Sequence, residues 1–149
     1  MFRGSSLHTL DEKGRIVIPS RFRDRIRAGG ADAVMISRLD GGLFAYPLNE
    51  WAKIENRINA QAERSESMRR FRRVFTGNAF ECPCDKQGRV LIPPTLRAYA
   101  GLEKEIVLAG VQDHFEIWSQ EKWAKENDAL ETELQEQPEV RNEIAKLGL

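Results

Sequence analysis

Long apolar runs and cysteines are both scarce in this 149-residue sequence. No stretch approaches the roughly 18 to 20 apolar residues that a membrane-spanning helix needs. Residues 1–4 lead into polar sequence rather than into the apolar segment of a signal peptide. The two cysteines, Cys82 and Cys84, are too few and too close together for a disulfide framework. These absences predict a cytoplasmic protein that does not associate with a membrane.

Catalytic and cofactor signatures are missing as well. The sequence has no Gly-x-Gly-x-x-Gly or Gly-Lys-Ser/Thr motif for a phosphate loop. Of its two histidines, His114 lies beside Asp113 with no nucleophile nearby, and His8 is the repeat counterpart of Cys82. A metal at Cys82 and Cys84 is disfavoured because zinc needs four ligands and usually a wider cysteine spacing. We therefore expect no enzyme, no cofactor, no metal and no small-molecule substrate; a thiol couple of Cys82 and Cys84 is the enzymatic alternative.

Net charge of one sign is also lacking, because 23 Lys and Arg residues balance 23 Asp and Glu residues. Residues 1–102 nevertheless carry 18 basic and 11 acidic side chains, a net charge of +7, whereas residues 103–149 carry 5 and 12, a net charge of −7. The basic region is compatible with nucleic acid as a partner. The alternative is that the two regions pair with each other, within one chain or between copies.

The sequence contains an internal repeat. Residues 10–23 (LDEKGRIVIPSRFR) align with residues 84–97 (CDKQGRVLIPPTLR) at an offset of 74, and the match continues at an offset of 72 as far as residues 51–53 and 123–125. So many identities in register indicate a duplicated unit. We divide the chain into a first repeat (1–54), an Arg-rich helical linker (55–76), a second repeat (77–126) and an acidic helical tail (127–149) that is broken at Pro138.

Each repeat predicts the element order β-β-α-β-β-α. The Asp-x-x-Gly-Arg motif and the apolar run that ends in proline are typical of a strand, a tight turn with glycine at positive φ, and a second strand. Short helices are expected at 19–26, with Ser20 as N-cap, and at 94–100, with Gly101 as the stop. Hairpins follow at 33–46 and 105–118, and then helices capped by Asn49 and Ser119. Trp51 and Trp123, in the first turns of these last helices, are expected to anchor them on the sheet.

A unit of about 45 residues buries little surface alone. We therefore expect the two repeats to pack about a pseudo-twofold axis, so that one chain acts as a covalent dimer. The fold class is α+β and mostly antiparallel, with an intertwined, β-barrel-like core and flanking helices.

The two turns concentrate the residues that point to a function. Asp11 and Arg15 stand four residues apart, as do Asp85 and Arg89, and each Asp is expected to fix its turn by accepting backbone N–H bonds. Basic side chains gather around the first motif at positions 3, 13, 15, 21 and 23. A two-stranded ribbon fits the major groove of DNA, where Arg pairs with guanine. Binding to double-stranded DNA is therefore the favoured function.

These residues also carry a resemblance. The Asp-x-x-Gly-Arg pattern with its apolar run and proline is similar to the swapped-hairpin DNA-binding fold of the AbrB and SpoVT regulators. The duplication, the opening residues 1–4 and the Arg-rich segment between the copies closely resemble the MraZ family. The resemblance covers nearly all 149 residues. It implies a bacterial transcriptional regulator that binds G-rich direct repeats upstream of its own division and cell-wall operon, assembles into a ring of several subunits, and is nucleoid-associated.

The family's Asp-x-x-x-Arg signature falls on Asp11 with Arg15 and on Asp85 with Arg89, and the basic cluster and the turn glycines complete the expected site. DNA contacts are expected from Arg15, Lys13, Arg3, Arg89 and Lys86. The turns are expected to be stabilised by Asp11, Gly14, Asp85 and Gly88. Since Glu12 stands against Lys86 and Lys13 against Gln87, the two turns should not bind DNA equally well.

Other readings remain open for the rest of the chain. The linker arginines 69, 70, 72 and 73 are expected to pair with Glu131, Glu133 and Glu136 of the same chain or of a neighbour rather than with phosphate. A ring-forming scaffold that binds protein partners is one rival to the DNA-binding function. RNA binding, or coating of nucleic acid without sequence preference, is another.

Overall fold

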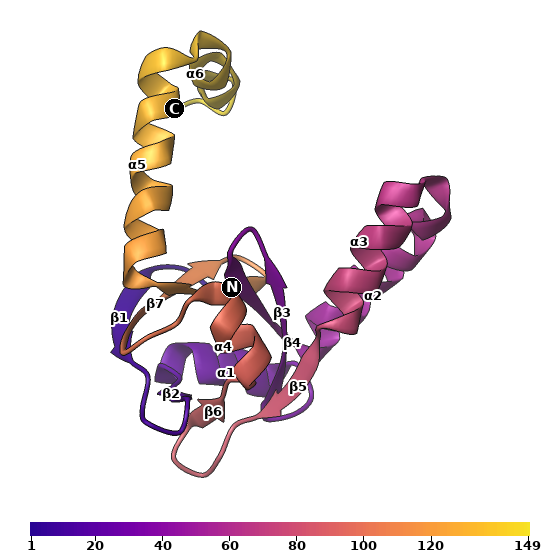
Figure 1. Cartoon of the computed structure of the whole chain (residues 1–149), viewed down its shortest axis with the longest axis vertical. Coiled ribbons are helices and arrows are strands. Elements are labelled where there is room, and N and C mark those ends of the chain that lie inside the picture. Colours follow the sequence, from indigo (N-terminus) through magenta and orange to yellow (C-terminus); the bar gives the residue numbers. More distant parts are fainter.

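The computed structural model describes all 149 residues and contains one large antiparallel sheet and one small ribbon (Figure 1). The sheet has the strand order β1-β7-β8-β4-β3-β5, and β2 and β6 form the two-stranded ribbon. The strands are β1 (Ser5–Thr9), β2 (Arg15–Val17), β3 (Ala33–Leu39), β4 (Gly42–Pro47), β5 (Phe80–Pro83), β6 (Arg89–Leu91), β7 (Glu105–Val111) and β8 (His114–Ser119). The helices are α1 (Ser20–Ala28), α2 (Leu48–Gln61), the 3-10 helix η1 (Ala62–Arg64), α3 (Glu66–Gly77), α4 (Pro94–Ala100), α5 (Gln120–Glu136) and α6 (Pro138–Ala145). This order confirms the predicted β-β-α-β-β-α repeat and the α+β class.

The two repeats exchange strands. β1 pairs with β7 of the second repeat, β5 pairs with β3 of the first, and β2 pairs with β6. The two strands that flank each Asp-x-x-Gly-Arg turn therefore do not form a ladder with each other. The turn itself closes, but the strands on either side of it pair with strands of the other repeat, as the swapped-hairpin resemblance implied.

A pseudo-twofold axis relates the repeats. Ile16 lies opposite Val90 in the ribbon, and these residues are repeat counterparts at the offset of 74. Phe44 lies opposite Glu116 in the sheet, and these are counterparts at the offset of 72. An axis through both pairs exchanges the two halves, which confirms the predicted covalent dimer.

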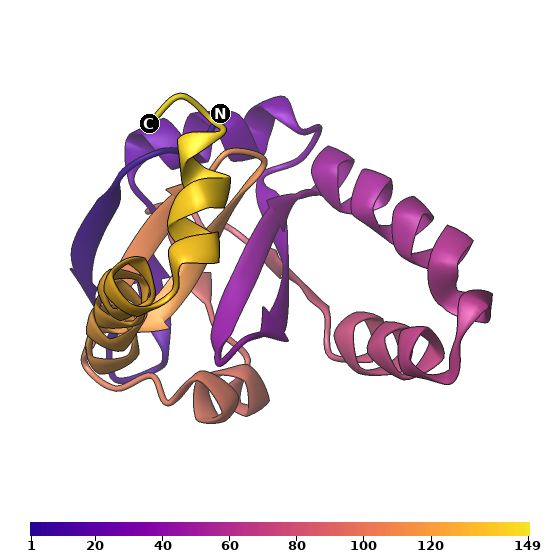
Figure 2. The same cartoon turned by 90° about the horizontal axis from the view of Figure 1, so that it is seen from above.

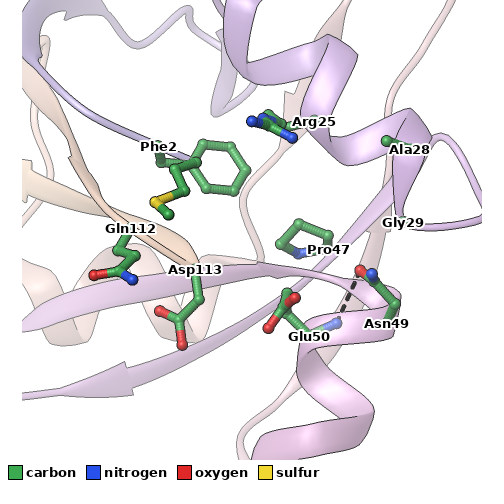
Figure 3. A pocket seen from close by; sticks show the side chains of 10 residues that line it. Phe2, Arg25, Ala28, Gly29, Pro47, Asn49, Glu50, Gln112 and Asp113 are labelled. Atoms are coloured by element: carbon green, nitrogen blue, oxygen red, sulfur yellow. Dashed lines mark hydrogen bonds between the residues drawn. The ribbon is translucent and has the colours of Figure 1, made fainter.

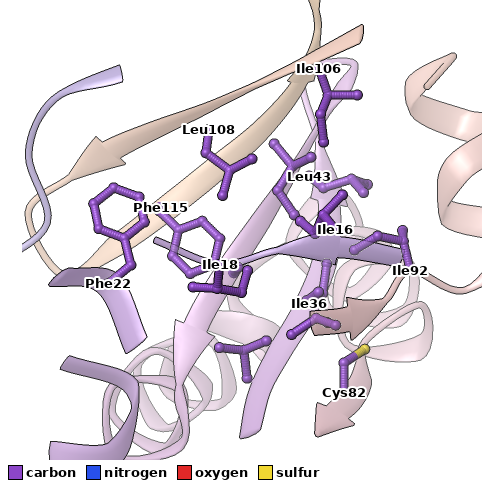
Figure 4. Packing of buried hydrophobic residues seen from close by; sticks show 14 of the residues in the cluster. Ile16, Ile18, Phe22, Ile36, Leu43, Cys82, Ile92, Ile106, Leu108 and Phe115 are labelled. Carbon is purple, nitrogen blue, oxygen red and sulfur yellow. The ribbon is translucent and has the colours of Figure 1, made fainter. Parts of the chain in front are cut away.

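The main core lies between the sheet and the ribbon (Figure 4). The β-branched residues of the motifs supply its base, because Ile16, Ile18 and Ile92 point inward from the ribbon. Phe22 of α1 packs against Phe115 of β8 with ring centroids 5.2 Å apart. Neither repeat forms this core alone, since both contribute residues to it.

The opposite face of the sheet holds a smaller aromatic cluster. Trp51 at the start of α2 stacks on Phe75 of α3, with centroids 5.6 Å apart, and contacts Tyr46 of β4 edge-on. Trp123 of α5 lies 6.5 Å from Trp118 of β8. Both helices are therefore anchored on the sheet by the repeated tryptophans, as predicted.

Two of the predicted helix caps are wrong and one is right. Ser119 caps α5 by accepting a hydrogen bond from the Lys122 amide at 3.1 Å. Ser20 and Asn49 instead lie inside α1 and α2, whose cap positions are the prolines before them. Each helix therefore begins directly after a proline, whose φ is fixed near the helical value, and earlier than the polar residues suggested.

Two helical arms rise from the sheet on the side away from the ribbon (Figures 1 and 2). The α2–α3 arm is a helical hairpin that reverses at η1, so the linker is two helices with Ser65 as the cap of the second. The α5–α6 arm breaks at Pro138, as predicted. The arms diverge from each other in both views. None of the helices combines the length and apolarity needed to cross a bilayer.

His114 introduces charge beside the aromatic cluster. Its imidazole lies between the rings of Phe44 and Tyr46, with centroids 5.0 and 4.9 Å away. Its nitrogens contact Asp113 at 2.7 Å and Glu116 at 2.9 Å. Burial lowers the pKa of His114, but its hydrogen bonds to Glu116 and Asp113 outweigh burial and raise the pKa above 6.5.

This cluster predicts a pH-dependent stability. A raised folded-state pKa means that the protonated imidazole stabilises the fold fully below pH 6.5, and that this stabilisation disappears as the pH rises through the folded pKa. Urea unfolding at a series of pH values should show the free energy of unfolding of the wild type falling across that range. His114→Gln should lack this component. Parallel pH curves for both proteins would contradict the assignment.

Candidate nucleic-acid interface

The two Asp-x-x-x-Arg turns have the same hydrogen-bonded geometry. In the first, Asp11 Oδ1 accepts from the amides of Lys13 at 2.9 Å and Arg15 at 2.8 Å, and Oδ2 accepts from Arg15 Nε at 2.7 Å. The Asp11 amide also donates to the Arg15 carbonyl at 3.0 Å. The carboxylate thus holds both the backbone of the turn and the base of the arginine side chain.

The second turn repeats these bonds. Asp85 Oδ1 accepts from the amides of Gln87 at 2.9 Å and Arg89 at 2.8 Å, and Oδ2 accepts from Arg89 Nε at 2.8 Å. Backbone hydrogen bonds from Arg15 and Arg89 are the largest cause that lowers the pKa of Asp11 and Asp85. Both aspartates therefore stay ionised at neutral pH, and the predicted turn-stabilising role is visible in the geometry.

Gly14 and Gly88 are required in these turns for two reasons. Their φ angles are 87° and 75°, in the region that L side chains rarely adopt. A Cβ on Gly14 would also lie 2.3 Å from the Arg97 guanidinium, and one on Gly88 would lie 3.0 Å from that of Arg23. Each turn is therefore packed under an arginine of the other repeat.

The arginines at positions 23 and 97 serve the fold. Arg23 Nη2 contacts Asp32 at 2.9 Å and donates to the Asp85 carbonyl at 2.9 Å. Arg23 thus belongs to the packing of the second turn and not to the basic surface in which sequence reasoning placed it. Arg97 is its repeat counterpart beneath the first turn.

The ribbon presents one outward face. Since Ile16 and Val90 point into the core, the alternation of strand residues turns Arg15 and Arg89 outward from diagonal positions. Their side chains are 27% and 29% exposed. Each Nε is held by its aspartate, and the terminal Nη atoms have no hydrogen-bond partner in the protein.

Val17 and Leu91 share this face and were missed by sequence reasoning. They lie directly opposite Arg89 and Arg15 in the ribbon, and their exposed fractions are 54% and 53%. The alternation of inward and outward side chains along residues 16–18 and 90–92 could have identified them, because the residues on either side of each are buried. The outward face of the ribbon therefore consists of two arginines and two exposed aliphatic side chains.

The other predicted contacts are placed unevenly. Lys13 and Lys86 are exposed at the tips of the two turns, and neither forms an ion pair. Both turns lie at the same end of the molecule, opposite the helical arms (Figure 1). Arg3 lies before β1, at the other end of that strand from the first turn, so the structure does not bring it to the ribbon.

The cysteine alternative has little support in the geometry. Burial raises the pKa of Cys82 to about 12 and that of Cys84 to about 11. A nucleophilic cysteine needs a lowered pKa, because the thiolate is the reactive form. The structure brings no group of three metal-ligating side chains together, and His8 bonds to Ser6 at 2.6 Å.

The fold and the paired turns define a duplicated, swapped-hairpin protein with a two-arginine ribbon. A family model described as "MraZ protein, putative antitoxin-like" matches residues 1–74 and 75–142. The chain belongs to the MraZ family of transcriptional regulators.

Individual relatives agree with the family model. The "Transcriptional regulator MraZ" of Desulforapulum autotrophicum is 65% identical over 149 residues, all of both chains. That of Desulfosudis oleivorans is 55% identical over the same coverage, and that of Limosilactobacillus reuteri is 46% identical over 84% of this chain and 86% of its own. The solution structure of PHS018 from Pyrococcus horikoshii has 16% identity and a TM-score of 0.34 over 78% of this chain and 88% of its own, which is too distant to support an argument.

The close packing of Gly14 gives a test of the turn. Gly14→Ala places a Cβ at positive φ and against the Arg97 guanidinium, and we expect it to lower the free energy of unfolding by about 1–3 kcal/mol. Gly77→Ala, where no atom lies within 4 Å and φ is not positive, should leave it nearly unchanged. Chemical denaturation of both variants makes the comparison. Equal effects would show that the turn does not need glycine.

Proposed function

We propose that this chain is a sequence-specific DNA-binding transcriptional regulator that reads G-rich direct repeats upstream of its own division and cell-wall operon as a ring-like homo-oligomer. The observation that carries the proposal is the outward face of the β2–β6 ribbon. It presents Arg15 from one repeat and Arg89 from the other. The proposal also places the protein in the cytoplasm on the nucleoid.

The dimensions of the ribbon support insertion into DNA. The major groove is about 12 Å wide and admits a two-stranded ribbon. Arginine Nη atoms pair bidentately with guanine O6 and N7, which suits a G-rich site. Val17 and Leu91, between the arginines, are suited to contact thymine methyl groups. The ribbon therefore offers both polar and apolar readout of base edges.

Ion pairs with aspartate give the arginines a defined direction. Asp11 and Asp85 hold Nε of Arg15 and Arg89, so that the side chains lose less conformational freedom when they bind. Lys13 and Lys86, at the tips of the turns, would contact phosphates. Glu12 beside Lys13 weakens the field of the first tip, and Gln87 beside Lys86 does not, so the two turns would contribute unequally.

Arg3 keeps a more distant role in the proposal. It is exposed and lies across β1 from the first turn. A duplex seated on the ribbon reaches Arg3 by continuing along the β1 side of the molecule, where the guanidinium would contact a phosphate.

The helical arms support head-to-tail assembly. The basic arm, residues 55–77, carries six arginines and three glutamates, and the acidic arm, residues 120–145, carries eight acidic and three basic side chains. Within the chain, Arg70 pairs with Glu66 and Arg72 with Glu63, so the predicted pairing with the tail does not occur inside one subunit. The diverging arms leave that pairing to a neighbouring copy.

A specific pair of surfaces on the arms is complementary. A groove of about 390 Å³ on α5 is lined by the apolar side chains of Trp123 and Leu130 and by the carboxylates of Glu126 and Glu133. On α3, Val74 is 39% exposed beside Arg70 and Arg73. We call Val74, Arg70 and Arg73 the α3 stripe. Its apolar side chain matches the apolar lining of the α5 groove, and its arginines match the glutamates of the groove in charge. Such a heterologous contact makes a ring when the rotation closes.

A ring explains how small ribbons achieve specific binding. One ribbon contacts few phosphates and binds weakly at physiological salt. Several ribbons on one face of a ring would bind several direct repeats, and effective concentration raises the apparent affinity by about 10²–10⁴. Repeats that face the ring together need a spacing close to one helical turn, about 10 base pairs.

Arg15→Ala tests the proposed reading of bases. We expect it to abolish the preference for a duplex with the upstream repeats over a scrambled duplex, measured by fluorescence anisotropy. The exposed ion pair with Asp11 contributes little to stability, so the thermal melt and the oligomer mass should not change. Lys53→Ala removes an exposed cation far from the turns and serves as the control. Loss of folding in Arg15→Ala would contradict the assignment, and loss of the oligomer would favour the scaffold alternative.

Charge reversal tests the arms. Glu126→Lys with Glu133→Lys should destroy the groove, and Arg70→Glu with Arg73→Glu should destroy the stripe, so that each double variant alone is monomeric. In a mixture, the intact stripe of one variant meets the intact groove of the other, and the two reversed surfaces also carry opposite charges, so the mixture should regain oligomers larger than a dimer. Light scattering after gel filtration measures the masses. A wild-type mass for either variant alone would contradict the contact.

A further inference from the structure

A cavity of about 620 Å³ opens at the junction of α1, the start of α2 and the turn between β7 and β8 (Figure 3). Arg25, Glu50 and Asp113 line it with charge, the N-terminal ammonium of Met1 lies near Arg25, and Phe2 and Pro47 supply apolar surface. Its volume lies in the range of about 300–1,000 Å³ that is typical of small-molecule sites. None of its lining residues belongs to the two turns of the ribbon.

The same junction in the second repeat is largely filled. By the two offsets, Tyr99 is the counterpart of Arg25, Lys122 of Glu50 and Gly41 of Asp113. Lys122 Nζ donates to the carbonyls of Gly41 at 3.2 Å and Tyr99 at 3.4 Å. The Gly41 amide donates to the Tyr99 hydroxyl at 3.0 Å. Side chains of the protein thus occupy the part of this junction that faces Gly41, and a smaller cavity of about 260 Å³ beside Gly101, Ser119 and Glu121 remains.

In the first repeat, the residues at the corresponding positions do not close the junction. Arg25 forms no hydrogen bond or ion pair in the protein, although Glu50 and Asp113 stand across the cavity from it (Figure 3). Glu50 pairs with Lys53 at 3.1 Å, and Asp113 with His114 at 2.7 Å. Opposite charges therefore face each other across a space that neither side spans.

We propose that this cavity binds a small zwitterion of the class of amino acids and short peptides. The carboxylate of the ligand pairs with the Arg25 guanidinium, whose fork matches a carboxylate bidentately. The ammonium group lies between Glu50 and Asp113. An apolar side chain of the ligand packs on Phe2 and Pro47.

Such a ligand would bridge the two repeats. The cavity joins α1, which follows β2, to the β7–β8 turn of the other repeat. Phe2 and Gln112 exchange two backbone hydrogen bonds of 2.8 Å at its edge. Binding therefore couples the ligand to the position of α1 and, through β2, to the ribbon. It also stabilises the folded chain by mass action.

The dipeptide alanyl-leucine is the probe. Thermal unfolding and isothermal calorimetry of the full chain should show that millimolar alanyl-leucine raises the Tm. N-acetyl-alanyl-leucine lacks the ammonium group and alanyl-leucinamide lacks the carboxylate. Each should bind at least about tenfold more weakly, because each loses one charge-assisted contact.

The double variant Arg25→Tyr with Glu50→Lys transplants the residues that fill the second junction, and it should abolish the Tm shift. Arg27→Tyr, on the same helix but outside the lining, is the matched control and should keep it. If the double variant does not fold, Arg25→Gln is measured instead. It should bind alanyl-leucine and alanyl-leucinamide equally well, because the guanidinium that pairs with the carboxylate is absent. Three results would each overturn the proposal. They are no Tm shift in the wild type, equal binding of the three probes to the wild type, and a full Tm shift in the Arg25→Tyr, Glu50→Lys variant. DNA does not enter these measurements, so their outcome is independent of the proposed function.

Discussion

The pairing of β2 with β6 across the pseudo-twofold axis is the contact on which the rest of the structure depends. Each strand has three residues, and apart from the isolated bridge between Cys84 and Val90 neither pairs within its own repeat. Ile16 and Val90 meet at the axis, where both are fully buried. The Ile18 amide bonds to the Gly88 carbonyl, and the Ile92 amide bonds to the Gly14 carbonyl, both at 2.9 Å. Each repeat therefore completes the turn of the other.

This crossing also makes the candidate site. Burial of the central residues turns the flanking ones outward, and antiparallel pairing sets Arg15 and Arg89 at diagonal positions about 7–8 Å apart. The distance between the two arginines is thus set by the core and not by flexible loops. The turns require glycine because their φ angles are positive, and an arginine of the other repeat packs over each of them. Fold and candidate function therefore depend on the same pairing of β2 with β6. Without it, Arg15 and Arg89 would not lie on one ribbon.

Much of this could be predicted from the sequence because the motif acts locally. Asp-x-x-Gly-Arg specifies a turn through carboxylate-to-amide bonds and a positive φ, and both copies have that geometry. Strand exchange leaves no local signal, since β1 carries the same pattern whether it pairs with β2 or with β7. The caps at Ser20 and Asn49 failed because the preceding prolines start the helices. Arg23 and Arg15 look alike in sequence, and their different roles depend on Asp32, which lies nearby only after folding. The empty junction at Arg25 becomes visible through its filled counterpart at Tyr99.

The central claim is that the ribbon reads sequence, and binding across a salt series tests it most directly. Fluorescence anisotropy would compare a duplex that carries the upstream repeats with a scrambled duplex of equal length. We predict that the repeats bind at least about a hundredfold more tightly at physiological salt, since contacts to base edges add to phosphate contacts. Equal affinities with the same salt slope for both duplexes would contradict it, because they would show a protein that coats nucleic acid without reading it.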